Sequence, residues 1–368
     1  MTRLSELGES HVLGRMLTHN RSGSQVVVGP GDDGAVTRPS GDLVSTADML
    51  VENEDFTRDW LDWGKLGRKA AAQNLADVCA MGAVPHGLLV SLAVPDDTDI
   101  ADLEALFSGI VAEASRAGQA LERDVPIIGG DLSSSGLIVV AITALGTVAA
   151  GTGASGVGGA GSTTAILRSG AAPGDGVYLA GTVGRAAAGL ELLFAGLRSD
   201  TAAPDLAALI DTQLAPQPDY AAMVTLTAAS AMIDVSDGLS TDLARIADAS
   251  GVGIDLDRSA LQGLIDPLLP AAEYVLDSRA HRGGSGGSCT GGANSTDGAA
   301  GTNDATEVES LALSWVLGGG EDHGFAASAR PSQSPGVGWR RIGEVRSGHD
   351  VSLDGTAVPT SGFSHFGK

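Results

Sequence analysis

The chain has 368 residues, 43% of them hydrophobic, which is enough for two domains of ordinary size. Its 22 basic and 45 acidic residues give a net charge of -23. This charge argues against nucleic acid or an anionic membrane as a partner, because both bind basic patches. The N-terminus has no apolar core of signal-peptide type, and no run reaches the roughly 18 apolar residues of a spanning helix. We therefore expect a cytoplasmic protein.

The first 150 residues alternate between strand-like and helix-like segments. The helical segments are amphipathic or rich in alanine, and glycine ends the second of them at Gly82. Residues 1–150 are thus predicted to form a compact α/β domain. The expected helices are 4–17, 63–82 and 99–118, and the expected strands are 25–29, 43–51, 87–95, 125–131 and 136–148.

The second half, residues 151–368, opens on a glycine-rich tract at 151–163 that matches G-x-G-x-x-G twice. A dinucleotide site needs a helix at that point, but residues 164–181 read as strand, turn and strand, so the match is taken as chance. A low-complexity tract at 281–307 is expected to be disordered and to interrupt the second domain. The remaining predicted elements are helices at 184–197 and 239–251 and a strand at 252–257.

Acidic residues recur beside glycine or another small residue, where strands end or helices begin. For any one of them a loop cap or a solvated charge is the simpler interpretation. As a set with few basic neighbours they favour a hard cation, because two like charges about 4 Å apart cost on the order of 4 kcal/mol at an effective dielectric near 20. Oxygen ligands of this kind suit Mg²⁺. The set is Asp33, Asp48, Asp77, Asp131, Asp234, Asp237, Glu321 and Asp322.

An anionic protein of this kind needs positive charge to hold a phosphorylated ligand. The sequence has no Walker lysine motif and no kinase-type catalytic loop, so metal ions would supply most of that charge. Arg168 is either a direct phosphate contact or an ordinary surface arginine. Ser236 and Asp237 open a predicted helix, where they could cap it, present its N–H groups to an anion, or do both.

Seven motifs occur in order: "GDD", "STADMLVE", "NLADVCAMGAVP", "IIGGD", "RSGAAPGD", "IDVSDGLSTDL" and "LGGGED". Together they resemble the thiamine-monophosphate kinase family, of the superfamily of aminoimidazole ribonucleotide synthetase and selenophosphate synthetase. The resemblance covers nearly the whole chain except 151–163 and 281–307. It implies an α/β (α+β) subunit of two domains, with an N-terminal mixed sheet that dimerises and a C-terminal α/β domain.

The resemblance also implies a reaction. ATP would transfer its γ-phosphoryl group in line to thiamine monophosphate, giving thiamine diphosphate, with several Mg²⁺ ions and no covalent enzyme intermediate. The substrate phosphate is already ionised at neutral pH, so no strong general base is needed. Positioning and metal charge would then carry the catalysis.

Site residues are carried over only where the motifs match. The implied catalytic residues are Asp77, Asp131 and Asp237. The implied metal ligands are Asp33, Thr46, Ala47 through its carbonyl, Asp48, Asp77, Asp131, Asp234 and Asp237. The implied nucleotide contacts are Gly130, Asp131, Arg168 and Ser236, and the implied substrate contacts are Glu321, Phe363 and Asp55.

The chain departs from the family pattern at two places. Asp55 stands in "VENEDF" where the family often has His, and His323 and Gly324 follow "GGED" where the family often has Tyr and an acid. These departures leave two alternatives open. One is a superfamily enzyme with a different acceptor, although no cysteine precedes Cys79 to serve selenophosphate chemistry. The other is a non-catalytic protein that binds Mg²⁺ and a nucleotide.

Overall fold

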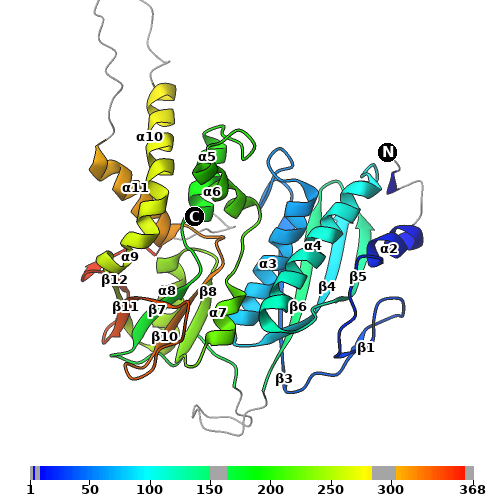
Figure 1. Cartoon of the computed structure of the whole chain (residues 1–368), viewed down its shortest axis with the longest axis horizontal. Coiled ribbons are helices and arrows are strands. Elements are labelled where there is room, and N and C mark those ends of the chain that lie inside the picture. The colour runs from blue at the N-terminus through cyan, green and yellow to red at the C-terminus, as the bar shows by residue number, and fades with distance from the viewer. Residues whose placement is uncertain (1–2, 5–8, 150–163, 284–303, 361–368) are drawn as a thin grey trace, which may run out of the picture.

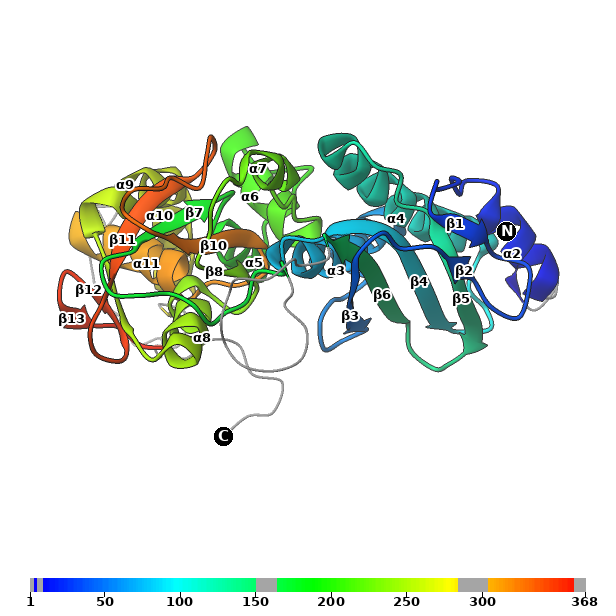
Figure 2. The same ribbon diagram turned by 90° about the horizontal axis from the view of Figure 1, so that it is seen from below.

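The computed structural model describes residues 3–4, 9–149, 164–283 and 304–360. Two lobes stand side by side, each built on one main sheet with helices packed against it (Figures 1 and 2). The N-terminal lobe contains helices α2 (Glu9–Leu17), α3 (Trp63–Ala80) and α4 (Ile100–Leu121), and strands β1 (Val26–Val28), β2 (Val36–Thr37), β3 (Asp42–Val51), β4 (Val84–Val94), β5 (Ile127–Ser134) and β6 (Val139–Val148).

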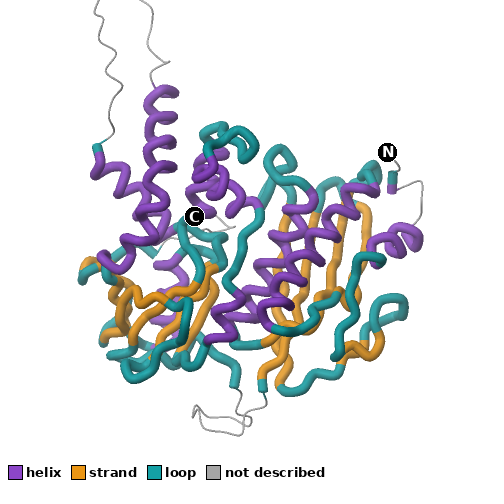
Figure 3. The backbone as a smooth tube through the Cα atoms, viewed as in Figure 1, coloured by secondary structure: helices purple, strands orange, loops and turns teal. Residues whose placement is uncertain are grey.

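The main N-terminal sheet has the strand order β3-β6-β4-β5, with β4 and β5 parallel and the other pairs antiparallel. Helices α3 and α4 cover one face, as the tube in Figure 3 shows. Side chains alternate between the faces of a strand, so Val140 and Ile142 are buried under the helices while Leu43 and Met49 on the other face are 54% and 58% exposed. The sheet therefore has one covered face and one open face.

Glycine lets α3 and α4 pack in direct backbone contact. A Cβ atom at Gly67 would lie 2.0 Å from the carbonyl oxygen of Leu106, and one at Gly109 would lie 2.0 Å from that of Gly64. Larger residues at either position would force the helices apart. The close packing fixes the position of α3, which also contacts the second lobe.

The C-terminal lobe contains a seven-stranded sheet of order β13-β12-β9-β11-β7-β10-β8. Strand β10 is buried along its whole length, as expected for an inner strand covered on both faces. The strands are β7 (Gly176–Ala180), β8 (Ala231–Val235), β9 (Gly253–Leu256), β10 (Gly324–Ala329), β11 (Arg340–Arg346), β12 (Val351–Leu353) and β13 (Thr356–Ala357). The helices are α5 (Arg185–Phe194), α6 (Pro204–Leu214), α7 (Tyr220–Thr225), α8 (Leu239–Ser250), α9 (Arg258–Ile265), the 3₁₀ helix η1 (Asp266–Leu268), α10 (Leu269–Gly283) and α11 (Ala305–Gly318).

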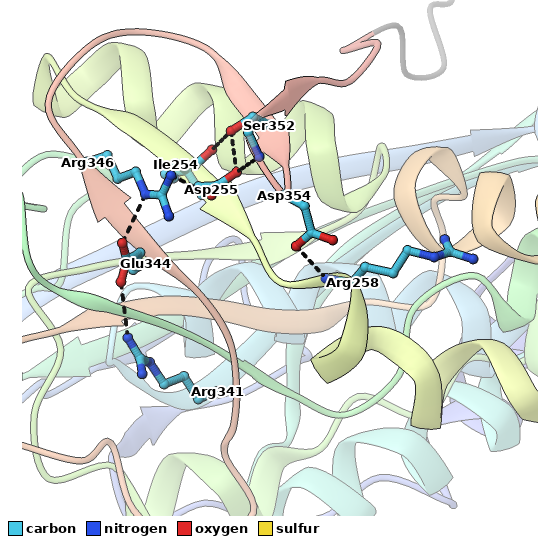
Figure 4. Close-up of polar contacts among 9 residues, drawn as sticks. Ile254, Asp255, Arg258, Arg341, Glu344, Arg346, Ser352 and Asp354 are labelled. Carbon is cyan, nitrogen blue, oxygen red and sulfur yellow. Dashed lines mark hydrogen bonds and ion pairs between the residues drawn. The ribbon is translucent and has the colours of Figure 1, made fainter.

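A buried carboxylate ties the strands at one end of this sheet together (Figure 4). Asp255 on β9 accepts hydrogen bonds from the Ser352 hydroxyl at 2.5 Å and the Gly355 N–H at 2.8 Å, and Arg346 on β11 pairs with it at 2.8 Å. Burial opposes ionisation of Asp255, but these hydrogen bonds and the arginine charge together lower its pKa. Asp255 therefore has a structural role, because its hydrogen bonds and ion pair link neighbouring strands of the sheet.

The expected α/β fold with two domains is confirmed, and two local predictions are wrong. Residues 165–168 were expected as a strand but run without regular structure. Residues 281–283 complete α10 and residues from 305 begin α11, so the two ends of the tract expected to be disordered are helical. The glycine-rich tract at 151–163 lies outside the described residues. Among the described residues, no helix is long and apolar enough to cross a membrane.

Candidate active site

Strand β3 and helix α3 bring the first predicted ligands together. The Thr46 hydroxyl donates to Asp77 Oδ2 at 2.7 Å, and the Asp48 N–H donates to Asn74 Oδ1 at 3.0 Å. The first contact requires the Thr46 side chain to point from β3 toward α3, and Asp48, two residues further on, lies on the same face of the strand. The strand alternation and the helix periodicity thus converge on one polar cluster.

The carboxylates of this cluster repel one another. Burial and the neighbouring charges of Asp234 and Asp48 raise the pKa of Asp77 to about 7, against the opposing hydrogen bond from Thr46. Burial likewise raises the pKa of Asp48, and the charges of Asp234 and Asp237 add to that rise. Among the described residues, no three His, Cys, Asp or Glu side chains already stand in a metal-binding arrangement. The cluster therefore holds unbalanced negative charge from both lobes.

The second lobe contributes Asp234, at the end of β8, and His323, just before β10. Their side chains are buried, and His323 Nδ1 lies 3.3 Å from Asp234 Oδ2. Burial by itself would lower the pKa of His323, but the hydrogen bond and charge of Asp234 outweigh it and raise that pKa. His323 was noted in the sequence only as a departure from the family. Its position two residues after Glu321 was the available signal that it belongs to the site.

Glycines allow the two loops that carry these residues to touch. The Glu321 N–H donates to the Ser236 carbonyl at 2.9 Å, and a Cβ at Gly320 would lie 2.1 Å from that same carbonyl oxygen. Gly238 has φ of +120° and packs against the backbone of Gly318. The motifs "IDVSDGLS" and "GGGED", about 80 residues apart in sequence, thus form one surface.

Asp237 already has a cationic neighbour that the sequence analysis missed. Arg245, two turns along α8, lies 2.5 Å from Asp237 Oδ2 and 2.5 Å from Asp242 Oδ1. Asp242 Oδ2 also accepts the Asp237 N–H at 3.0 Å. Burial is the main cause that raises the pKa of Asp242 to about 7. The i, i+3 spacing of Asp242 and Arg245 on α8, with Asp237 just before the helix, was the signal in the sequence.

The two acids of "GGGED" have different roles. Asp322 is buried and accepts hydrogen bonds from the Ala186 N–H at 2.9 Å and the Thr182 hydroxyl at 2.9 Å, so it caps the N-terminus of α5. Burial raises its pKa to about 6. Glu321 instead lies where the two lobes meet, and its carboxylate pairs with Lys69 of α3 at 3.2 Å.

Asp131 and Asp33 are not brought to this cluster within one chain. Asp131 is exposed on β5, opposite Ser91, and the register continues through Ala141 to Met49 on the open face. Three strand spacings, about 14 Å, separate it from β3. Asp33 is exposed in the loop between β1 and β2, which lies at the far end of the lobe (Figure 2).

The other predicted residues are placed as follows. Packing is sufficient reason for glycine at position 130, because a Cβ there would lie 1.8 Å from the Val90 carbonyl oxygen. Arg168 is exposed. Asp55 Oδ2 accepts the Val51 N–H at 2.8 Å, which ties the loop after β3. Ala47 lies on β3 between Thr46 and Asp48, with its side chain on the open face, and Phe363 lies outside the described residues.

Family models match both lobes of the chain. Residues 31–148 match the AIR synthase related protein N-terminal domain, and residues 172–281 match the corresponding C-terminal domain. The two matches cover most of the elements that build the cluster, from β3 to α8.

Known proteins align over nearly the whole length. A thiamine-monophosphate kinase of Mycobacterium tuberculosis (strain CDC 1551 / Oshkosh) is 36% identical over 99% of this chain and 93% of its own, and that of Corynebacterium glutamicum is 32% identical over 98% and 93%. The crystal structure of the Stenotrophomonas maltophilia K279a enzyme superposes with a TM-score of 0.68 at 27% identity, covering 95% of this chain and 96% of that one. A structure of AaThiL complexed with AMPPCP and TMP gives 0.65 at 27% identity, covering 100% and 99%. The chain therefore belongs to the AIR synthase related proteins and, within them, to the thiamine-monophosphate kinases.

Proposed function

We propose that this chain transfers the γ-phosphoryl group of ATP to thiamine monophosphate, forming thiamine diphosphate. One observation carries the proposal. Carboxylates from both lobes, Asp48 and Asp77 on one side and Asp234 on the other, meet in a chain that is 36% identical to a thiamine-monophosphate kinase over 99% of its length. A relative with the same fold, AaThiL, has been crystallised with AMPPCP and TMP.

The donor set fits Mg²⁺. It consists of carboxylate oxygens and one hydroxyl, and Mg²⁺ binds through a few such groups together with substrate phosphates. Burial and like-charge repulsion raise the pKa of Asp77 to about 7, and a divalent cation would relieve this repulsion. Asp48, Asp77 and Asp234 would hold the metal, with Thr46 beside them. Bound Mg²⁺ would supply the positive charge that draws the anionic ATP and substrate into an acidic protein.

The chain's own groups then position the two substrates. Ser236 lies at the start of the segment that leads into α8, where backbone N–H groups can meet a phosphate. With Arg168 it makes up the nucleotide contacts proposed for one chain, and Gly130, next to Asp131 on β5, would come from a second copy. Glu321 would face the cationic thiazolium, with Asp55 and Phe363 as the other proposed substrate contacts. The acceptor oxygen is already ionised, so these residues need only align it with the γ-phosphorus.

We also propose that the active form is a homodimer packed through the open face of the N-terminal sheet. That face presents Leu43 and Met49, and both edge strands of the sheet, β3 and β5, are unpaired on one side within the described chain. Asp131 lies on the same open face, at the β5 edge. A second copy packed there could deliver its Asp131 to the metal cluster of the first.

A coupled assay tests the function directly. Purified protein with ATP and thiamine monophosphate is expected to form thiamine diphosphate only when Mg²⁺ is present. The control uses the same protein with free thiamine or thiamine diphosphate as acceptor, neither of which should be phosphorylated at a comparable rate. Turnover of another phosphorylated acceptor in preference to thiamine monophosphate would reject the proposed substrate.

A further inference from the structure

Lys69 is a buried cation on the side of α3 that faces the second lobe. Only 2% of its side chain is exposed. A buried ammonium group is costly unless charged or polar partners surround it. Its partners therefore show what the residue is for.

Those partners all come from the other lobe. Lys69 Nζ lies 3.2 Å from Glu321 Oε2 and donates to the Gln213 carbonyl oxygen at 2.9 Å. Gln213, near the end of α6, also donates from Nε2 to Glu321 Oε2 at 2.6 Å. Helix α3, helix α6 and the loop before β10 thus meet at one carboxylate oxygen.

This arrangement leaves the other oxygen of Glu321 available. Oε1 has no hydrogen-bond partner within the described parts of the chain, and the Glu321 side chain is 38% exposed. The main chain is also fixed, because Glu321 has φ of +68° and its N–H is bonded to Ser236. Burial opposes the charge on Glu321, but Lys69 and the hydrogen bond from Gln213 outweigh it and lower its pKa. Glu321 is therefore an oriented, ionised carboxylate.

We propose that Lys69 is a positioning residue that holds Glu321 for the cationic thiazolium of thiamine monophosphate. The inference rests on the proposed function in one respect, the assignment of Glu321 as a substrate contact. Lys69 takes one oxygen and does not itself touch the substrate. The positive charge of Lys69 partly offsets the negative charge of Glu321, so Lys69 acts by fixing the direction in which the free oxygen points. The surrounding acids supply most of the negative potential that attracts the thiazolium.

The competing explanation is that Lys69 only docks the two lobes. The chain offers a matched control in Lys65, one turn earlier on the same face of α3. Lys65 Nζ also crosses to the second lobe, where it lies 2.8 Å from Asp211 Oδ1, but it makes no contact with Glu321. Lys65→Met breaks an ion pair between the lobes and leaves the Glu321 carboxylate held.

The test compares Lys69→Met with Lys65→Met in calorimetric titrations of the full-length protein, with Mg²⁺ present. Lys69→Met is expected to weaken binding of thiamine monophosphate about tenfold or more, the effect of losing about 1.4 kcal/mol, while AMPPCP binds as to wild type. Lys65→Met should change neither affinity by more than about twofold. Equal losses for both ligands, or the same loss in both variants, would overturn the positioning role.

Two further variants show whether Lys69 acts through Glu321. In a Glu321→Gln background, adding Lys69→Met should cause no further loss of thiamine monophosphate binding, whereas additive losses would contradict the proposal. Gln213→Leu removes the second donor to Glu321 Oε2. It should weaken binding of thiamine monophosphate, but not of AMPPCP, by less than Lys69→Met does. This variant replaces Lys69→Met in the test if Lys69→Met does not fold. Binding is measured without turnover, so a wild-type protein that binds thiamine monophosphate but does not phosphorylate it would reject the proposed function and leave this inference intact. A wild-type protein that does not bind it would reject both.

Discussion

Five of the six acids predicted as metal ligands fall into two groups that the fold treats differently, while the sixth, Asp237, pairs with Arg245. The inner group, Asp48, Asp77 and Asp234, lies where α3 meets the second lobe. Asp234 is buried, Asp77 is partly buried, and Asp48 is exposed but close enough to the other two to share their repulsion. The outer group, Asp33 and Asp131, is exposed at the far side of the N-terminal lobe. Their sequence motifs were equally clear, so the difference comes only from where each segment packs.

The difference teaches that burial makes a carboxylate responsive to its neighbours. In the inner group, burial of the side chain, followed by the charges of Asp234 and Asp48, raises the pKa of Asp77 from an ordinary value of 3.8 to about 7. Exposed carboxylates are screened by water and salt. One chain thus builds an inner cluster of like charges that a cation would neutralise, while the outer acids lie too far away within one chain to share in it.

The largest expected effect is on turnover after a change in the inner group. Asp77→Asn should lower kcat about a hundredfold or more, because it removes a charge that holds the metal against the transferring phosphoryl group. The same change should leave the fold intact and raise Tm in metal-free buffer at pH 8, since it relieves repulsion from Asp234 and Asp48. Steady-state kinetics and thermal melts check the two halves. A kcat close to that of wild type would show that Asp77 is not part of the active site.

A mixing experiment tests whether the outer group acts through a second copy. Asp77→Asn and Asp131→Asn are each expected to be nearly inactive as homodimers. If Asp131 completes the site of its neighbour, each mixed dimer regains one intact site. Random reassociation would then restore about a quarter of wild-type activity, since half the dimers are mixed and each has one working site of two.

The control for this experiment is the same mixture kept under conditions where subunits do not exchange, which should stay inactive. No recovery after exchange, with mixed dimers verified by mass spectrometry of tagged subunits, would mean that Asp131 does not act across the dimer. Full activity of Asp131→Asn by itself would mean that it is not needed at all.

The smallest expected effect is on stability as a function of pH. The folded-state pKa of Asp77 is raised to about 7 from an ordinary value of 3.8, so the folded protein holds a proton that the unfolded chain has already lost. The free energy of unfolding therefore falls as pH rises from about 4 to about 7 and levels off above that. Asp242, with a pKa also raised to about 7, acts in the same direction.

In metal-free buffer we expect Tm to drop by several degrees between pH 5 and pH 8, and less steeply in Asp77→Asn. Asp33→Asn is the matched outer variant and should follow the wild-type curve, because that side chain is exposed. Melting curves at closely spaced pH values decide this. A flat Tm across the range, or equal slopes in all three proteins, would show that burial and repulsion do not raise the pKa of Asp77 in the folded protein.

Most of the fold could be predicted from local sequence, and the errors have local causes. The periodicity of α3 and its glycine stop at Gly82 are encoded in neighbouring residues, so the helix was placed to within two residues. Residues 165–168 have strand-forming side chains, but the N–H of Ile166 donates to Met81 of the other lobe, so they serve as a connection between lobes. The low-complexity tract predicted at 281–307 extended too far at both ends, because composition does not mark where a helix ends or begins.

The active site likewise has a part that local sequence predicted and a part that it did not. The acidic motifs predicted metal-binding chemistry without a structure, because a set of oxygen donors with few basic neighbours favours a hard cation. Lys69, His323 and Arg245 were not assigned to the site, since a cation is informative only when its partners are known, and those lie 252, 89 and 8 residues away respectively.

The sequence by itself determined the residue types, their order and the strand or helix that presents each one, because these depend on spacing and on chemistry within a few residues. Only the tertiary structure decided that Asp48, Asp77 and Asp234 face one another while Asp131 lies on the opposite side of the sheet. The reason is that electrostatic coupling depends on distance and burial, and both are set when two lobes pack together.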